Sequence, residues 1–392
     1  MDPIWLLALL PLAVISGWLA AWRTHSHVQR GSLPAPMSET YYRSINFLAN
    51  DQHDQALDVL AKALEDYDES LEIQLALGTL FRRRGEIERA TQIHQSLIAR
   101  PGLSRDQKSE VLFELASDYF KAGMLDRSEN LLLELGVGDG FREPALRLLI
   151  QIYESGKEWE RAIAAAGHLD RLTPETWGPV IAQYHCELGE RDLSGGDYRA
   201  AKARADNALK LNRNCARAVI LRGRLDALAG SHRQAVKTWM GLCDDHPEML
   251  HEVAGLVRAS SESLGQQEVY AEFLKQAVEA SSDERLHLLL VDHFSGQGRT
   301  EDAEMQLLSW VEEKASLSGL HRLLEIRVDR EPGSTSERDY QLVRKVTGKL
   351  LADRVGYECR FCGFQGKSLH WQCPGCRHWD TTAPRVATLK LS

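Results

Sequence analysis

The sequence predicts an all-α protein in which two-helix repeats stack into a superhelix, with a transmembrane helix before them and a small four-cysteine metal domain after them. Three observations lead to this fold class. A small residue recurs at a nearly constant spacing along most of the chain, a long uncharged segment lies near the start, and four cysteines form two close pairs near the end. The repeats account for most of the length, so we expect their architecture to decide the function.

The uncharged segment runs from Ile4 to Trp22, within an expected anchor of residues 1–22. At about 1.5 Å per residue, such a helix crosses the hydrocarbon core once. Its acidic start and bulky exit do not fit a cleaved signal peptide, and a buried helix of a soluble domain would normally keep a polar face. Arg23 and Arg30 follow the segment and no Lys or Arg precedes it. We therefore expect a single-pass protein with its bulk in the cytoplasm.

Length and composition narrow the class of protein further. With 392 residues, 43% of them hydrophobic, the chain can bury the cores of two or three domains. A net charge of −9, from 47 basic and 56 acidic residues, lacks the basic excess of a nucleic-acid binder, so we expect none. Four of the seven cysteines lie between Cys359 and Cys376, unlike a secreted disulfide framework. A reducing compartment is therefore expected.

The repeats are expected over residues 38–312, as about eight units after a linker at 23–37. The recurring small position is occupied by Ala56, Ala90, Ser128, Ala162, Ala201, Ala235, Val269 and Ala303. Five of the seven intervals equal that from Ala56 to Ala90, and two longer ones predict insertions near residues 101–108 and 173–180. Five positions earlier lies a glycine suited to a tight turn at positive φ, at Gly85, Gly123, Gly196, Gly230 and Gly298.

Two further positions of the period indicate packing. Twelve positions before the small residue the chain has Gly78, Ala116, Gly189 and Gly223, which allow close helix contact. Four positions after it come Leu60, Ala205, Trp239, Phe273 and Leu307, an apolar stripe at i and i+4. This pattern resembles the tetratricopeptide repeat, whose unit has about 34 residues. The resemblance implies a concave groove, lined by the first helix of each pair, that binds other proteins.

Two surface features of the array are expected from the same pattern. Residues 313–352 are expected to form capping helices, near 317–328 and 338–351, with the polar outer face that the end of a solenoid needs. A basic stripe for an acidic partner is one interpretation of Arg82, Arg83, Arg84, Arg222 and Arg224. The alternative interpretation is a solvated helix face.

The candidate metal site consists of Cys359, Cys362, Cys373 and Cys376, two C-x-x-C pairs separated by a short loop. Each pair can form a tight knuckle, and two knuckles close a tetrahedral S₄ site with no open position, which favours a structural role. Gly363 and Gly375 suit the knuckle turns. The flanking His370 and His378 are not expected to be ligands. The other cysteines, Cys186, Cys215 and Cys243, are expected to be isolated small hydrophobes within the repeats.

Residues 353–385, with Tyr357 before the first knuckle and the pattern Trp371-x-Cys-Pro-x-Cys, resemble the rubredoxin-like iron site. That resemblance favours iron, although zinc also accepts four thiolates and the spacing does not decide between them. A redox role for this site is the alternative to a structural one.

The order of anchor, repeats and S₄ module resembles the lipopolysaccharide assembly protein B family of bacteria. The resemblance implies an inner-membrane adaptor that promotes degradation of the lipid A deacetylase LpxC by the membrane protease FtsH and so limits lipopolysaccharide synthesis. It assigns Cys359, Cys362, Cys373 and Cys376 as metal ligands and no catalytic residue, so no enzyme is expected. The alternatives are an assembly platform for envelope biosynthesis enzymes and an iron-sensing protein.

Overall fold

The computed structural model describes residues 70–135, 142–314, 316–330, 337–352 and 356–385, and the helical positions 55 and 59. The expected anchor at 1–22, the linker at 23–37 and the first two positions of the apolar pattern, Ala56 and Leu60, lie outside these residues. Within the part that is described, no helix has the length and apolar character needed to span a membrane. The chain divides into two compact units, residues 1–152 and 153–392.

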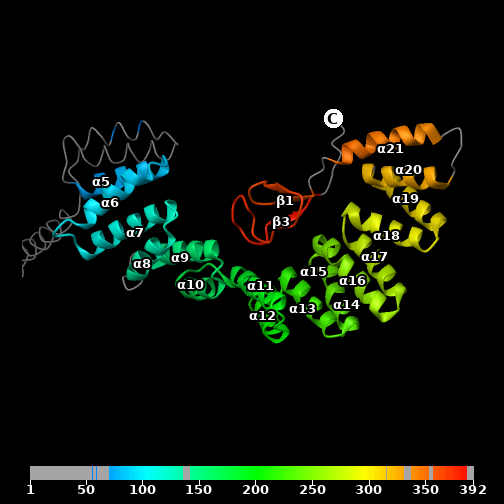
Figure 1. Ribbon diagram of the computed structural model, residues 1–392, viewed down its shortest axis with the longest axis horizontal. Helices are drawn as coiled ribbons and strands as arrows, with labels where there is room; N and C mark the ends of the chain where they lie inside the picture. Colours follow the sequence, from blue (N-terminus) through cyan, green and yellow to red (C-terminus); the bar gives the residue numbers. More distant parts are fainter. Residues whose placement is uncertain are drawn as a thin grey trace, which may run out of the picture. The chain divides into compact units, whose positions relative to one another are not determined.

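The first unit consists of antiparallel helix pairs (Figure 1). Its described helices are α5 (Leu71–Arg83), α6 (Ile87–Ile98), α7 (Arg105–Lys121), α8 (Leu125–Leu135) and most of α9 (Arg142–Gly156). Leu71, Leu75 and Val111 pack with Leu97 in a buried cluster shared by α5, α6 and α7. The pairing α5–α6 and α7–α8 is the two-helix repeat expected from the period.

The second unit continues the array and ends in a small sheet (Figure 1). Its helices are α10 (Trp159–Leu172), α11 (Gly178–Ser194), α12 (Tyr198–Leu211), α13 (Ala216–Leu228), α14 (His232–Met240), α15 (Leu242–Asp245), η1 (Pro247–Met249), α16 (Leu250–Leu264), α17 (Gln267–Ala280), α18 (Glu284–Gly296), α19 (Thr300–Lys314), α20 (Leu317–Arg330) and α21 (Glu337–Ala352). The end of α9 pairs with α10, and one continuous core runs through α13 to α20.

The structure confirms the two signals on which the repeat prediction rests. Within the described residues, Ala90, Ser128, Ala162, Ala201, Ala235 and Ala303 are fully buried, and Val269 is partly buried. The five turn glycines have φ between 74° and 84°, a backbone region that costs glycine little because it has no Cβ. The insertions lengthen first helices: α7 and α11 have 17 residues each, against 13 in α5 and α13.

Glycine lets a large ring approach the neighbouring helix at two equivalent positions. A Cβ on Gly223 would overlap the indole of Trp239, and a Cβ on Gly78 would overlap the imidazole of His94. Both rings are buried, and each follows the small position of its repeat by one helical turn. Glycine is therefore needed at these two positions, because the ring of the second helix occupies the space that a larger side chain would fill.

The expected capping helices form, but the exposed face of α21 carries apolar residues beside its polar ones. Helix α21 packs on α20, where the Thr347 hydroxyl lies 2.7 Å from Nδ1 of His321. On α21, the side chains of Leu342, Val346 and Leu350 are exposed. The expected polar outer face is therefore interrupted by an apolar stripe, because α20 does not cover every apolar residue of α21.

The four-cysteine segment folds as a three-stranded antiparallel sheet rather than a helix. Its strands are β1 (Tyr357–Cys359), β2 (Gln365–Gly366) and β3 (Thr382–Pro384), in the order β2-β1-β3. In the register, Tyr357 lies opposite Gly366 on one side and Pro384 on the other. We call residues 356–385 the metal module. The strands are short, so loops carrying the cysteines make up most of it.

Candidate metal centre

The first knuckle begins at the end of β1. The Gly363 N–H donates to the carbonyl of Cys359 at 2.9 Å, and the Cys359 N–H donates to the carbonyl of Phe364 at 2.8 Å. Gly363 adopts φ of 74°, which turns the chain back after Cys362. The expected role of Gly363 in this turn is confirmed.

The second knuckle has the same hydrogen bonds but a different turn residue. The Arg377 N–H donates to the carbonyl of Cys373 at 2.8 Å, and the Cys373 N–H donates to that of His378 at 2.9 Å. The positive φ, 61°, falls on Arg377 and not on Gly375. A Cβ on Gly375 would lie 3.4 Å from Sγ of Cys362, an ordinary contact distance, so crowding does not require glycine at this position either. The turn role expected for Gly375 is thus corrected.

The two knuckles bring all four sulfurs together. The Sγ atoms of Cys359 and Cys376 lie 3.7 Å apart, as do those of Cys362 and Cys373, and all four lie within 4.8 Å of one another. A tetrahedron with Zn–S bonds of about 2.3 Å has edges of about 3.8 Å. The four thiolates therefore fit one tetrahedral ion, and iron and zinc both accept this donor set.

Backbone groups complete the surroundings of the sulfurs. N–H groups of Phe361 and Cys362 point at the sulfur of Cys359, and that of His378 points at the sulfur of Cys376. The Thr381 hydroxyl lowers the pKa of the Cys359 thiol to about 6, whereas burial raises the pKa of the Cys376 thiol to about 12. A divalent cation among the four sulfurs would favour the thiolate at every position.

The module leaves one edge of the centre open to solvent. Cys359 and Cys373 are buried, whereas Cys362 is exposed and Cys376 is half-buried. The Phe361 ring stacks on His378 with ring centroids 3.9 Å apart. Among the described residues, the cluster that could hold a metal ion consists of Cys359, Cys362, Cys373 and Cys376.

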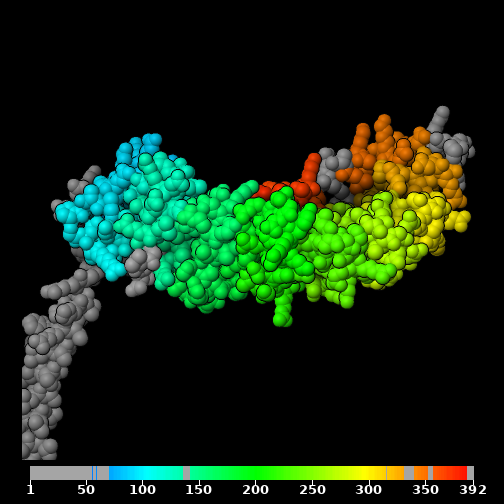
Figure 2. Space-filling model, turned by 60° about the horizontal axis from the view of Figure 1, so that its bottom comes forward, coloured from blue at the N-terminus to red at the C-terminus, as the bar shows by residue number. Residues whose placement is uncertain are grey.

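The metal module lies against the first helices of the repeats in the second unit, where its atoms meet those of the repeats in Figure 2. At one end, the Tyr357 hydroxyl donates to the carboxylate of Glu252 on α16. Nη1 of Arg285, on α18, donates to the same hydroxyl at 2.8 Å, and its guanidinium lies 5.0 Å from the ring centroid. Asp283 holds Arg285 in place at 2.7 Å.

At the other end, Trp379 inserts among aromatic rings of α10 and α11. Its Nε1 donates to Oε1 of Glu154 on α9 at 2.7 Å, and the Tyr184 hydroxyl donates to the same oxygen at 2.8 Å. The indole meets Trp159 and Tyr184 edge-on, with ring centroids 5.9 and 5.7 Å apart. Burial raises the pKa of Tyr184, so its hydroxyl stays protonated and donates. The Glu154 carboxylate is thus the shared acceptor of this contact.

Between these ends the contact continues across α13. The guanidinium of Arg217 lies 5.6 Å from the ring centroid of Trp371, while Glu187 and Glu190 of α11 balance its charge at 2.8 Å. Leu369 and Trp371 also pack against the repeat core. First helices α9, α11, α13, α16 and α18 therefore all contact the module, which covers the groove side of these repeats. We call this set of contacts the docking face.

The sequence did not predict the docking face, because its residues lie far apart along the chain. Tyr357 lies 105 residues from Glu252, and Trp379 lies 225 residues from Glu154. The available signal was the density of aromatic residues around the cysteines, where Tyr357, Trp371 and Trp379 occur in one short segment. That density indicates a buried surface but not its partner.

Two other sequence interpretations need correction. Cys186 and Cys215 are not isolated: both are fully buried and their Sγ atoms lie 4.0 Å apart. Cys243 is half-buried against the core that runs through α13 to α20. The arginines of the candidate basic stripe are partly neutralised within their own units. Arg82 pairs with Glu114 and Asp118, and Arg222 pairs with Asp206, so both arginines neutralise carboxylates of neighbouring helices.

Comparisons with known protein families give matches to the repeats and to the metal module. A model of the rubredoxin metal binding domain matches residues 357–384, and a tetratricopeptide repeat model matches residues 43–102 and 186–240. The crystal structure of a tetratricopeptide repeat protein from Parabacteroides merdae matches with 16% identity and a TM-score of 0.35, over 64% of this chain and 96% of that one.

Similarity to curated proteins extends along nearly the whole chain. Lipopolysaccharide assembly protein B of Escherichia coli strain K12 is 29% identical over 379 residues, which cover 97% of each chain. The protein of the same name from Haemophilus influenzae is 29% identical over 387 residues, again 97% of each chain. These matches confirm the family resemblance that the sequence predicts.

Proposed function

We propose that this protein, a relative of lipopolysaccharide assembly protein B along nearly its whole length, is a non-enzymatic adaptor at the cytoplasmic face of the bacterial inner membrane. The observation that carries the proposal is the match of repeats and metal module together, at 97% coverage of both chains. Tetratricopeptide stacks bind other proteins, and the expected anchor at residues 1–22 would hold this one at the membrane.

The proposed action is to limit lipopolysaccharide synthesis by delivering the deacetylase LpxC to the membrane protease FtsH. The physical basis is proximity: a scaffold that holds client and protease on one membrane surface raises their effective concentration without any chemistry of its own. The docking face supports this role, because a module seated across five first helices fixes the relative positions of those repeats.

In this proposal the metal has a structural role. Cys359, Cys362, Cys373 and Cys376 would hold one tetrahedral ion, iron by the rubredoxin resemblance or zinc, and the bound ion would lock the two knuckles together. The exposure of Cys362 favours a second candidate, a redox or iron-sensing role, because an electron carrier needs an accessible edge. Replacing iron by zinc separates the two: a structural site keeps the adaptor active, and a redox site does not.

Depletion of the protein tests the proposed client. We expect the half-life of LpxC to lengthen severalfold when this protein is removed from cells, and to recover with the full chain but not with a chain lacking residues 1–22. An unchanged LpxC half-life would contradict the protease-adaptor proposal. If envelope biosynthesis enzymes other than LpxC are then captured with the protein, the assembly-platform alternative is supported instead.

A further inference from the structure

Helix α21 exposes an apolar stripe at the end of the repeat array. Leu342, Val346 and Leu350 are 63%, 50% and 61% exposed, and Val343 beside them is 42% exposed. Spacing of i, i+4 and i+8 places the first three on one line along the helix. We propose that this α21 stripe, residues 342, 343, 346 and 350, lies on the surface of an anionic lipid bilayer.

The stripe cannot turn inward, because the other side of α21 is already packed. Thr347 is buried against His321 of α20, and a Cβ on Gly348 would lie 3.3 Å from the same imidazole. The end helix of a solenoid normally presents a polar outer face, which keeps the protein soluble. A row of exposed aliphatic side chains at this position therefore marks a surface that another body covers.

Charge next to the stripe indicates the chemistry of that body. Lys345 and Lys349 are exposed on one flank of the stripe, and neither pairs with a carboxylate of any residue that the structure describes. From Tyr340 to Ala352 the chain has three basic residues and no acidic one, although its net charge is −9. An apolar face flanked by lysines is typical of helices that lie at the interface of anionic membranes.

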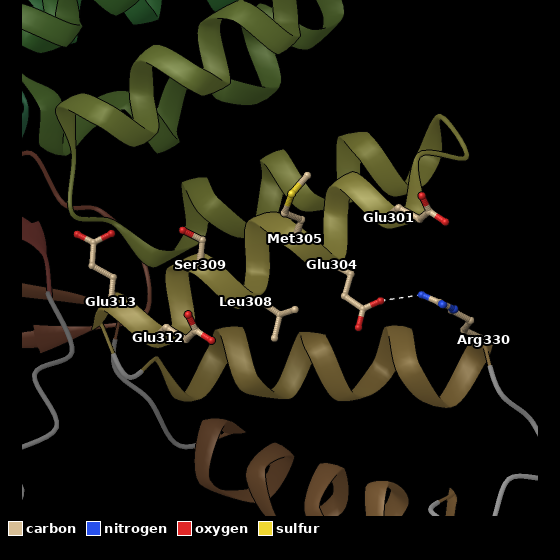
Figure 3. Close-up of a pocket in the computed structure, with 8 residues that line it drawn as sticks. All are labelled: Glu301, Glu304, Met305, Leu308, Ser309, Glu312, Glu313 and Arg330. Atoms are coloured by element: carbon tan, nitrogen blue, oxygen red, sulfur yellow. Dashed lines mark hydrogen bonds and ion pairs between the residues drawn. The ribbon is translucent and has the colours of Figure 1, made fainter.

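The neighbouring helix α19 shows the opposite surroundings for an exposed apolar residue. Met305 is 63% exposed in a groove of about 770 Å³ between α19 and α20 (Figure 3). The groove is lined by the acidic residues Glu301, Glu304, Glu312 and Glu313. Among the described residues of this lining, only Glu304 has a cationic partner, since it pairs with Arg330 at 2.8 Å. Anionic lipid would be repelled from this groove, so Met305 is a matched control.

The alternative occupant is a second copy of the chain. An antiparallel pair of α21 helices related by a two-fold axis would place Lys345 and Lys349 of one copy opposite the same lysines of the other. Like charges in that arrangement oppose association. A bilayer instead offers the complementary charge, and the expected anchor keeps it within reach. The inference depends on the proposed membrane location and is independent of the proposed client.

A photocrosslinking residue in the full chain identifies what covers the stripe. We would place p-benzoylphenylalanine at position 346, or at position 305 as the control, in protein expressed in bacterial cells and irradiated there. We expect a phospholipid adduct, identified by mass, at 346 and at most about a tenth of that yield at 305. An adduct with another protein, with a second copy or with the same chain, or no adduct at 346, would overturn the proposal.

The lysines are tested in the same cells. Lys345→Glu with Lys349→Glu, added to the position 346 probe, should lower the lipid adduct roughly tenfold, since each basic side chain contributes to attraction by anionic lipid. Lys345→Arg with Lys349→Arg should keep it. Equal yields from both pairs would contradict the charge argument. Fractionation separates the two proposals: protein in the membrane without a lipid adduct contradicts only the α21 inference, and protein outside the membrane contradicts the proposed location.

Discussion

The repeats and the metal module are stabilised by different kinds of contact. In the repeats, neighbouring helices bury small and apolar side chains against each other, as Trp239 does on Gly223, and each pair lies close along the chain. The metal module has strands of only two or three residues, and its buried positions are mainly Tyr357, Cys359, Cys373 and Ala383. The packing of its own helices is therefore enough to stabilise the repeat array, whereas the module depends on a bound metal ion and on the docking face.

Removal of the metal should give the largest difference between the two regions. We expect Cys373→Ser, or chelation, to unfold residues 356–385, because binding of a structural zinc ion supplies on the order of 10 kcal/mol of folding free energy. The helices should keep their circular dichroism. Metal content and hydrogen exchange of the full chain measure both effects. Cys243→Ser, outside the site, is the control and should leave metal content unchanged.

The repeat core should respond next most strongly to loss of a buried ring. Trp239→Ala should lower the free energy of unfolding by about 3–5 kcal/mol, because the ring is 1% exposed and fills the space above Gly223. Met305→Ala, at a position 63% exposed, should change it by less than about 0.5 kcal/mol. Denaturant unfolding compares the two. Equal effects would show that Trp239 is not a core residue.

The repeat signals were predictable because they are local. Ala235, Gly230 and Trp239 lie within one helix pair, and the same relations recur in unit after unit, so a single chain displays them many times. The cysteine knuckles were predictable for the same reason, since each sulfur pair is set by three consecutive peptide units. In these cases local spacing determines the contact.

Other features of the fold could not be predicted from the sequence, because they depend on contacts between distant residues or on the local backbone conformation. Arg285 meets Tyr357 across 72 positions, and Cys186 meets Cys215 across 29, and neither pairing has a repeated signal. The second knuckle turns at Arg377, although Gly375 nearby is the residue that tolerates positive φ best. Exposure of the α21 stripe depends on how much of the helix α20 covers, which periodicity does not give.

A substitution in the docking face should weaken the contact between module and repeats while leaving the metal bound. We expect its cost in free energy to be smaller than that of Trp239→Ala. Trp379→Phe removes the indole N–H that donates to Glu154, whose side chain is 8% exposed, and should cost about 1–3 kcal/mol of docking free energy. Faster hydrogen exchange at the end of α9, at constant metal content, would measure this loss. Phe361→Ala is the control on the module, since this side chain is 66% exposed. Metal loss from Trp379→Phe would contradict a separate docking role.

The smallest effect concerns pH and one histidine of the repeats. His287 stacks on Trp310 with ring centroids 4.5 Å apart, and burial lowers its pKa to about 4. The pKa of His287 in the folded protein lies below its unfolded value of about 6.5, so the folded state favours the neutral imidazole. Its contribution to the free energy of unfolding is therefore fully present above pH 6.5 and decreases as the pH falls towards 4. His287→Phe should remove about 1 kcal/mol of that decrease, allowing for partial solvent screening. Unfolding curves at pH 7 and pH 4.5 measure this difference. An equal loss of unfolding free energy in the unsubstituted chain and in the His287→Phe variant would exclude His287 as the cause.

Hydrogen exchange of the full chain, with and without metal, tests most directly whether the metal folds the module onto the repeats. We expect metal removal to accelerate exchange in residues 356–385 and at the docking face, at the end of α9 and the start of α16, while α14 and α17 keep their protection. Unchanged exchange at α9 and α16 after the module has lost its metal would contradict it.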